Sequence, residues 1–166
     1  MLRPATAADV PFIRGIAGRP ENAPFITDEP EPALLAYLAD PSARVVIWES
    51  GAGPAGFALF CTVGDPSAAV ELRRLALAGT GDGRGQVFLR ALLDYGFGTL
   101  GAARVWLDAS SENPRAMRTY DRAGFTLEGR LRQHWYRPAL GRVVDVMLYG
   151  MLRSEWESLE PLPTEA

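Results

Sequence analysis

Hydrophobic and polar positions along the chain follow two periods, and these divide it into predicted strands and helices. Short runs rich in Val, Ile, Leu and Phe predict strands, whereas apolar positions spaced three and four residues apart predict helices. A first helix is predicted after Thr6 or Asp9, either of which could cap it, and a loop rich in Pro and Gly follows over residues 18–32. Further helices are expected at residues 32–39, from about 86 to 98, and at 114–123. Strands are expected at residues 2–4, 44–49, 55–63, 69–77, 104–109, 125–131 and 143–151, the last two separated by a loop that contains Gln133 to Tyr136.

The order of these elements predicts an α/β (α+β) fold with a mixed central sheet of about six to seven strands flanked by helices. Residues 44–77 hold three strands joined by short turns, which favours antiparallel pairing. A helix separates strand 69–77 from strand 104–109, so these two should run parallel through a right-handed crossover. The central pair of the sheet is therefore expected to be parallel.

Length and composition favour a single cytoplasmic domain. The chain has 166 residues, 48% of them hydrophobic and 22% charged, and no apolar run reaches the roughly 18 residues that a membrane helix needs. A net charge of −3 predicts no nucleic-acid partner, and one Cys with one His predicts neither a disulfide nor a cluster of soft metal ligands. We expect one domain over residues 1–157 and a frayed acidic tail over 158–166, with no membrane association; a homodimer is compatible with the sequence.

A turn with alternating glycines stands between the central strand and the next helix. It reads Gly79-Thr80-Gly81-Asp82-Gly83-Arg84-Gly85-Gln86. Glycine permits positive φ angles and close approach of a ligand to the backbone, and the first turn of a helix presents unpaired N–H groups to an anion. The turn is thus a candidate phosphate site, and the alternative is a flexible surface loop. A dinucleotide or triphosphate domain fits poorly, because Arg84 or Phe88 falls where the third Gly of Gly-x-Gly-x-x-Gly is required.

A second candidate lies on the helix over residues 114–123. Asn113 should cap this helix, with Pro114 at its first position and Gly124 as its left-handed end. Seven residues make nearly two helical turns, so Asn113 and Tyr120 should point the same way, about 20° apart. Both could face a crevice at the carboxyl ends of the parallel strands, or Asn113 could only cap while Tyr120 packs in the core.

These motifs in this order resemble the GCN5-related N-acetyltransferases, most closely the branch that acetylates ribosomal-protein amino termini and small-molecule amines. The resemblance covers most of residues 2–156. It is carried by Glu71-Leu72-Arg73-Arg74-Leu75-Ala76-Leu77, Gly81-Asp82-Gly83-Arg84-Gly85-Gln86-Val87-Phe88-Leu89, Trp106-Leu107-Asp108, Asn113-Pro114-Arg115-Ala116, Tyr120, Gly124-Phe125 and Glu128-Gly129-Arg130-Leu131-Arg132. It implies a sheet splayed between its two central parallel strands.

The resemblance implies acetyl-CoA as co-substrate, with no metal. The amides of Gly81, Asp82, Gly83, Arg84, Gly85 and Gln86 would hold the diphosphate, and the backbone at Leu75 and Leu77 would pair with the pantetheine arm. A backbone N–H near Leu75 would also serve as oxyanion donor. Asn113 would contact the arm, and Tyr120 would protonate the departing thiolate.

Two points of the implied site stay open. Family members often begin the phosphate turn with Gln or Arg, where this chain has Thr80; a register beginning at Asp82 would place a carboxylate nearest the diphosphate. The general base is expected to be Glu71, whose alternative role is an ion pair with a neighbouring arginine. Asp108 and Ser110 are alternatives, whereas His134 is expected to be exposed in a loop.

The predicted function is acetyl transfer to a primary amine, on a small molecule or a peptide N-terminus, by direct attack within a ternary complex. Acidic residues in the loop over 18–32 suit a cationic amine. A thiol-mediated route is disfavoured because Cys61 has no histidine near it in sequence. The alternative function, a non-catalytic acyl-CoA-binding or sensing module, rests on the carboxylate of Asp82 in the phosphate turn.

Overall fold

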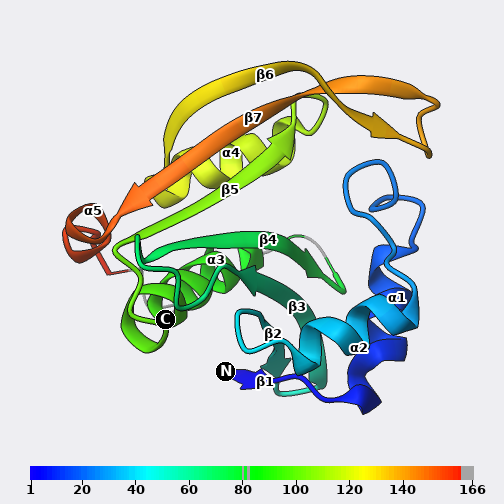
Figure 1. Cartoon of the computed structure of the whole chain (residues 1–166), viewed down its shortest axis with the longest axis horizontal. Helices are drawn as coiled ribbons and strands as arrows, with labels where there is room; N and C mark the ends of the chain where they lie inside the picture. The colour runs from blue at the N-terminus through cyan, green and yellow to red at the C-terminus, as the bar shows by residue number, and fades with distance from the viewer. Residues whose placement is uncertain (80, 82, 162–166) are drawn as a thin grey trace.

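The protein is one seven-stranded mixed sheet with helices on both faces (Figure 1). The computed structural model describes residues 1–79, 81 and 83–161. The strand order is β1-β2-β3-β4-β5-β7-β6, and β4 pairs with β5 in parallel while the other neighbours are antiparallel. The strands are β1 Leu2–Pro4, β2 Arg44–Ser50, β3 Gly53–Cys61, β4 Ala69–Leu77, β5 Arg104–Ser110, β6 Thr126–Arg137 and β7 Arg142–Leu152. The predicted fold class and the parallel central pair are confirmed.

The helices divide between the two faces of the sheet. Helices α1 and α2 lie on one face, and α3 and α4 lie on the other (Figure 1). The α-helices are α1 Val10–Ala17, α2 Glu31–Ala39, α3 Arg84–Asp94, α4 Pro114–Ala123 and α5 Arg153–Glu157; a 3₁₀ turn, Ala7–Asp9, precedes α1, and a π-helical turn, Tyr95–Thr99, follows α3.

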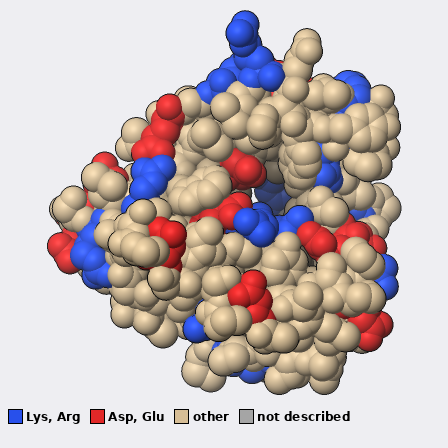
Figure 2. Space-filling view, in the orientation of Figure 1, with Lys and Arg blue, Asp and Glu red and all other residues tan. Residues whose placement is uncertain are grey.

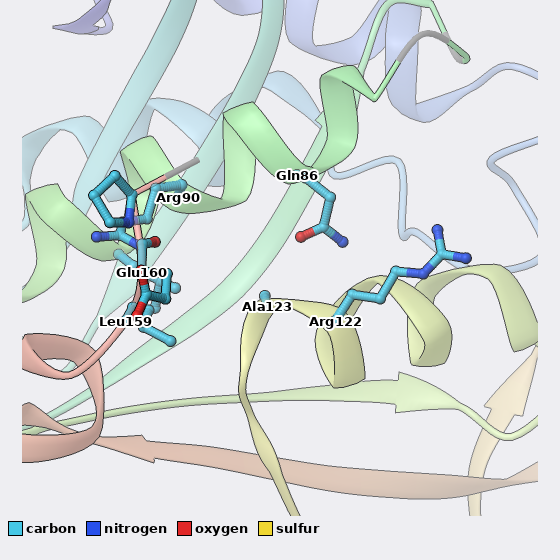
Figure 3. A pocket seen from close by; sticks show the side chains of 8 residues that line it. Gln86, Arg90, Arg122, Ala123, Leu159 and Glu160 are labelled. Atoms are coloured by element: carbon cyan, nitrogen blue, oxygen red, sulfur yellow. The ribbon is translucent and has the colours of Figure 1, made fainter. Parts of the chain in front are cut away.

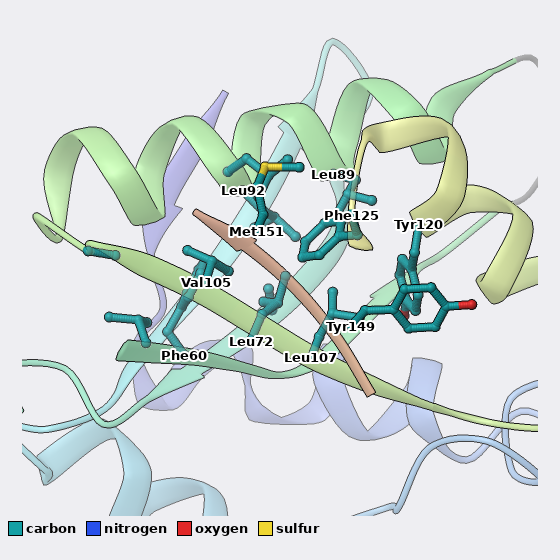
Figure 4. Packing of buried hydrophobic residues seen from close by; sticks show 14 of the residues in the cluster. Phe60, Leu72, Leu89, Leu92, Val105, Leu107, Tyr120, Phe125, Tyr149 and Met151 are labelled. Carbon is teal, nitrogen blue, oxygen red and sulfur yellow. The ribbon is translucent and has the colours of Figure 1, made fainter. Parts of the chain in front are cut away.

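The larger core lies between the sheet and helix α3. Leu89 and Leu92 of α3 have no exposed surface and pack over Val105 and Leu107 of β5 (Figure 4). The apolar positions of α3 recur on one face, as its helical period predicts, and the sheet supplies alternate residues of β5 and β7. This core therefore fixes where α3 begins relative to the end of β4.

Helix α4 has the termini that its sequence predicts. Asn113 caps the helix, since its Oδ1 accepts a hydrogen bond from the backbone N–H of Ala116 at 3.1 Å. Pro114 occupies the first helical position, and Gly124 ends the helix with φ +91°. The helix is thereby fixed at both ends beside the carboxyl end of β5.

Strand β6 is longer than predicted. The residues expected to form a loop, Gln133 to Tyr136, belong to the strand, which runs on to Arg137. The first two of them lie in a bulge between Leu131 and Trp135. Gln133 has φ +47°, and its N–H donates to Oδ1 of Asp145 at 2.7 Å, so this cross-strand contact holds the bulge. The expected loop was wrong because such a bulge leaves no periodic signal in the sequence.

The chain remains anchored after α5. Leu159 packs against the larger core, and the backbone carbonyl of Glu160 accepts a hydrogen bond from Arg90 at 3.1 Å. The expected frayed tail began at residue 158; residues 162–166 of it lie outside the described residues. The domain boundary at 157 stays a prediction. In the part of the chain that the structure describes, no helix has the length and apolar character to span a bilayer.

Candidate functional site

The two parallel strands separate after three residue pairs. β4 pairs with β5 only through Ala69–Arg104, Val70–Val105 and Glu71–Trp106, although β4 runs on to Leu77 and β5 to Ser110. The register between β3 and β4 shifts at Leu59, which leaves Arg73 as an extra residue in β4. Such a bulge bends its strand, so it accounts for β4 turning away from β5. Figure 2 shows a hollow between the two halves of the sheet, with Arg, Asp and Glu side chains around it.

Glu71 lies at the last paired position before the strands separate. The residue is buried, and its Oε2 accepts hydrogen bonds from Nε of Arg73 at 3.0 Å and from a terminal nitrogen of Arg73 at 2.5 Å. The ion pair that the sequence offered as the alternative reading of Glu71 is thus present. Both hydrogen bonds fall on one oxygen, Oε2, so the guanidinium of Arg73 orients this carboxylate.

Asp108 lies on the other strand, two residues beyond the last β4–β5 pair. Its neighbours Leu107 and Ala109 point into the larger core, so by strand alternation Asp108 points to the opposite face. The residue keeps exposed surface, and the surrounding protein, followed by the charge of Glu71, raises the pKa of its side chain. A carboxyl group with a raised pKa, beside the gap, suits a general base better than an arginine-bound one.

The other two base candidates have different roles. Ser110 is buried, and its Oγ accepts a hydrogen bond from the backbone N–H of Glu112 at 3.2 Å, so it shapes the turn before α4. His134 lies exposed in the β6 bulge, as expected.

Tyr120 lies on helix α4, on the face of the sheet opposite to the one that Asp108 points to. Its ring lies 5.5 Å from that of Tyr149 in an edge-on arrangement and 6.0 Å from that of Phe125 (Figure 4). Burial, followed by the charge of Asp108, raises the pKa of its phenol. Tyr120 is thus both a core aromatic and a phenol within electrostatic reach of Asp108. A phenol is protonated at neutral pH already at its ordinary pKa, so Tyr120 is in the form that a proton donor requires, and the raised pKa makes it a weaker acid.

Asn113 keeps a donor available in addition to its capping bond. Its Oδ1 is used by Ala116, whereas no hydrogen bond among the described residues uses its Nδ2. The capping role is therefore present, and it is compatible with a second role as a donor toward the gap. Nothing in the capping geometry requires a choice between the two.

The glycine turn adopts the backbone that its sequence predicts. Gly81 has φ +114° and Gly83 has φ +70°, and a Cβ built on either would meet no atom within 4 Å. The N–H groups of Arg84 and Gln86 donate to the carbonyls of Gly81 and Gly83, at 3.2 and 2.9 Å. Two of the amides expected to hold a diphosphate are thus also used within the turn. Thr80 and Asp82, on which the choice of register depends, lie outside the described residues.

The remaining predicted backbone positions line the gap on the side of β4. Leu75 and Leu77 pair with Ala58 and Gly56 of β3 and lie beyond the last contact of β4 with β5. Their strand therefore has an edge without a strand partner in the described part of the chain. Such an edge can add an extended ligand through main-chain hydrogen bonds.

The acidic residues of the segment before α2 are already paired in part. Asp28 contacts Arg14 at 3.2 Å, and Glu29 contacts Arg74 at 2.6 Å. These pairs reduce the negative charge that the sequence offered to a cationic amine. Cys61 is buried, and burial raises the pKa of its thiol, which gives it the character of a core residue.

A separate cavity of about 330 Å³ lies away from the gap, between α3, α4 and the end of the chain (Figure 3). Gln86 and Arg90 of α3 and Arg122 of α4 border it, and Gln86 also joins the two helices through a hydrogen bond from Nε2 to the carbonyl of Thr119, at 2.9 Å. The cavity lies on the outer side of the larger core. Glu71, Asp108 and Tyr120 are not among the residues that line it.

The curated relatives that the chain resembles are named as N-acetyltransferases. Two curated relatives are each 32% identical over 76 residues: a spermidine N(1)-acetyltransferase of Vibrio cholerae and an uncharacterised N-acetyltransferase, p20, of Bacillus licheniformis. Each match spans 46% of this chain but only 43% and 42% of the respective relative. These alignments thus cover less than half of the curated relatives.

Similar solved structures cover nearly the whole chain. A crystal structure of the Vibrio cholerae spermidine N-acetyltransferase in complex with CoA and spermine matches with a TM-score of 0.85 at 21% identity, over 95% of this chain and 98% of that one. A dodecameric structure of the same enzyme matches with a TM-score of 0.80 at 23% identity, over 95% and 96%. The family model described as the acetyltransferase (GNAT) family matches residues 12–125, most of the sheet and helices α1 to α4. The chain belongs to the acetyltransferase (GNAT) family.

Proposed function

We propose that the protein is an acetyl-CoA-dependent N-acetyltransferase that acetylates a primary amine, on a small molecule or a peptide N-terminus. The observation that carries the proposal is the gap between β4 and β5, which begins after Glu71; Asp108 follows on β5, and its charge acts on the phenol of Tyr120. Family membership and the likeness to enzymes named for amine acetylation support the same reaction.

The residues along one side of the gap suit acetyl-CoA as co-substrate. The positive φ angles of Gly81 and Gly83 keep side chains away from the turn at the start of α3, where the helix dipole favours a phosphate. The unpaired edge of β4 at Leu75 and Leu77 would hold an extended arm, and Nδ2 of Asn113 would donate to it. Acetyl-CoA supplies the acetyl group as a thioester, and no metal is required.

Asp108 is the general base of this proposal, with Glu71 next to it. A primary amine has a pKa near 10 and must lose a proton to attack a carbonyl carbon. Asp108 would accept that proton, because no arginine among the described residues binds its carboxylate and its pKa is raised. Glu71, held by Arg73, would keep the pKa of Asp108 high and add negative charge that attracts an ammonium group.

Tyr120 acts on the opposite side of the carbonyl. Its protonated phenol would donate to the sulfur as the carbon–sulfur bond breaks, while a backbone N–H of β4 near Leu75 would donate to the carbonyl oxygen. Positioned acids and oxyanion donors of this kind typically contribute about 10²- to 10⁴-fold and 10²- to 10³-fold in rate. Acid and base on opposite faces allow direct attack of the amine without a covalent enzyme intermediate.

Release of free thiol tests the proposal. The protein is mixed with acetyl-CoA and a panel of amines: spermidine, cadaverine, tyramine, a lysine ester and a serine-initiated hexapeptide. We expect thiol release that depends on one or more of these amines, with a product heavier by one acetyl group in the mass spectrum. Tight binding of acetyl-CoA with no turnover across the panel would instead favour the acyl-CoA-binding module.

A further inference from the structure

We propose that Arg137 is a positioning residue that fixes the segment over residues 19–28 as a wall of the acceptor site. This inference rests on the proposed function. Arg137 ends β6, in the half of the sheet beyond the gap, whereas residues 19–28 connect α1 to α2 in the other half. In Figure 1 the tip of the β6–β7 hairpin reaches across to this connection.

The contact uses all three nitrogens of the Arg137 guanidinium. Nε donates to the carbonyl of Pro24 at 2.9 Å, and the two terminal nitrogens donate to the carbonyl of Ala23 at 2.8 Å and to Oγ1 of Thr27 at 3.2 Å. The side chain also stacks on the ring of Trp135, 3.8 Å from its centre, and Arg137 is only 3% exposed. A planar fork with three fixed acceptors specifies one conformation of the segment.

The charge of Arg137 is buried without a carboxylate partner among the described residues. All three acceptors are neutral, and burial, followed by the charge of Arg74, lowers its pKa. Burying a cation beside another cation costs stability unless its donors are fully used. An apolar residue would cost less at this place, so the arginine is better explained by the conformation that it imposes than by stability.

The same segment is also bound to β4, on the near side of the gap. Arg19 donates to the carbonyl of Ala78, and Glu29, directly after the segment, pairs with Arg74 of β4 at 2.6 Å. The segment therefore bridges the two halves where β4 and β5 have separated, and it borders the hollow of Figure 2. The three hydrogen bonds of Arg137 are the only hydrogen bonds between this segment and β6 that the described residues show, so loss of Arg137 should release that end of the segment alone.

Two substitutions and a matched control test the inference. Arg137→Met keeps the stacking on Trp135 but removes every donor, and Arg137→Lys keeps the charge but not the fork. The control is Arg142→Met: Arg142 is the cross-strand partner of Arg137, but it is exposed and pairs with Glu112. Two readouts are used for each folded variant, hydrogen exchange of residues 19–28 without ligand, and steady-state constants for acetyl-CoA and for the panel amine with the highest kcat/KM.

We expect faster exchange in residues 19–28 for both Arg137 variants and about a tenfold higher KM for the amine, with KM for acetyl-CoA within about twofold and the control unchanged. Unchanged exchange in this segment, or equal changes in both KM values, would overturn the inference. If the wild-type protein transfers no acetyl group, the proposed function fails, whereas the exchange measurement still decides whether Arg137 fixes the segment.

Discussion

The guanidinium of Arg73 holds the carboxylate of Glu71 through two hydrogen bonds, of 3.0 and 2.5 Å, at the position where β4 and β5 separate. Arg73 is the extra residue of the β4 bulge, so the irregularity that opens the sheet also supplies the partner of Glu71. Asp108, on the facing strand, has no arginine contact among the described residues. The two carboxylates beside the gap therefore differ in their contacts, and we expect them to differ in their catalytic roles.

Asp108→Asn is expected to lower kcat/KM about 100-fold, whereas Glu71→Gln should lower it less than about tenfold. The first change removes the proton acceptor, whereas the second removes a charge that only raises the pKa of that acceptor and attracts the ammonium group. Steady-state thiol release with both variants checks this. The opposite order of effects would return the role of base to Glu71.

Glu71→Gln should also change the pH dependence. A base works only when deprotonated, and the raised pKa of Asp108 means that its active form is lost at a higher pH than for an ordinary aspartate. Removing the charge of Glu71 lowers this pKa, so more of the base stays active in acid. The ratio of kcat/KM for Glu71→Gln to that for wild type should rise as pH falls from about 8 to about 5. This ratio cancels titration of the amine, and a flat or falling ratio would contradict the coupling.

The phosphate turn can be tested through two exposed glycines. Gly81→Ala puts a side chain on a residue with φ +114°, which costs of order 1–3 kcal/mol in this conformation, so KM for acetyl-CoA should rise about tenfold. Gly79→Ala is the control, because Gly79 has no positive φ and a Cβ there meets nothing within 4 Å. Equal effects of the two substitutions would mean that the turn conformation does not matter for binding.

The ion pair between Arg3 and Asp9 should make stability depend on pH. Both terminal nitrogens of Arg3 donate to Asp9 at 2.8 Å, and this contact, with a backbone bond from Thr6, lowers the pKa of Asp9 to about 2. A depressed carboxyl pKa stabilises the folded state above the ordinary value near 3.9, and the contribution is lost as pH falls through about 2. Asp9→Asn should therefore cost about 1–2 kcal/mol at pH 7 and less than about 0.5 kcal/mol at pH 2, where half of the Asp9 carboxyl groups are protonated in the folded state. Urea unfolding at both pH values measures this, and an equal cost at both would rule the ion pair out as its source.

Local signals predicted the parts of the fold that are stabilised locally. Asn113, Pro114 and Gly124 set the ends of α4 through contacts within a few residues, and the alternating glycines set the turn before α3. The antiparallel pairing of β2, β3 and β4 followed from the short turns between them, and the parallel pair followed from the helix between β4 and β5. These features depend on residues that are near each other in sequence.

Contacts between distant segments could not be predicted from the sequence. The bulge at Arg73 arises from the pairing of β4 with β3, and the long β6 depends on Asp145 of β7. Arg137 is 113 residues from Pro24, and no pattern in the sequence joins them. For Asn113 and Tyr120 the structure shows the capping and packing roles, and their roles toward acetyl-CoA stay predictions.

The most direct test of the account is Tyr120→Phe. The substitution keeps the ring that packs against Phe125 and Tyr149 and removes only the phenol oxygen. We expect kcat to fall about 100-fold or more while the dissociation constant for acetyl-CoA, measured by calorimetry, stays within about twofold. An unchanged kcat, or a loss of binding as large as the loss of rate, would show that Tyr120 serves packing alone and would contradict an acyl-transfer site between the separated strands.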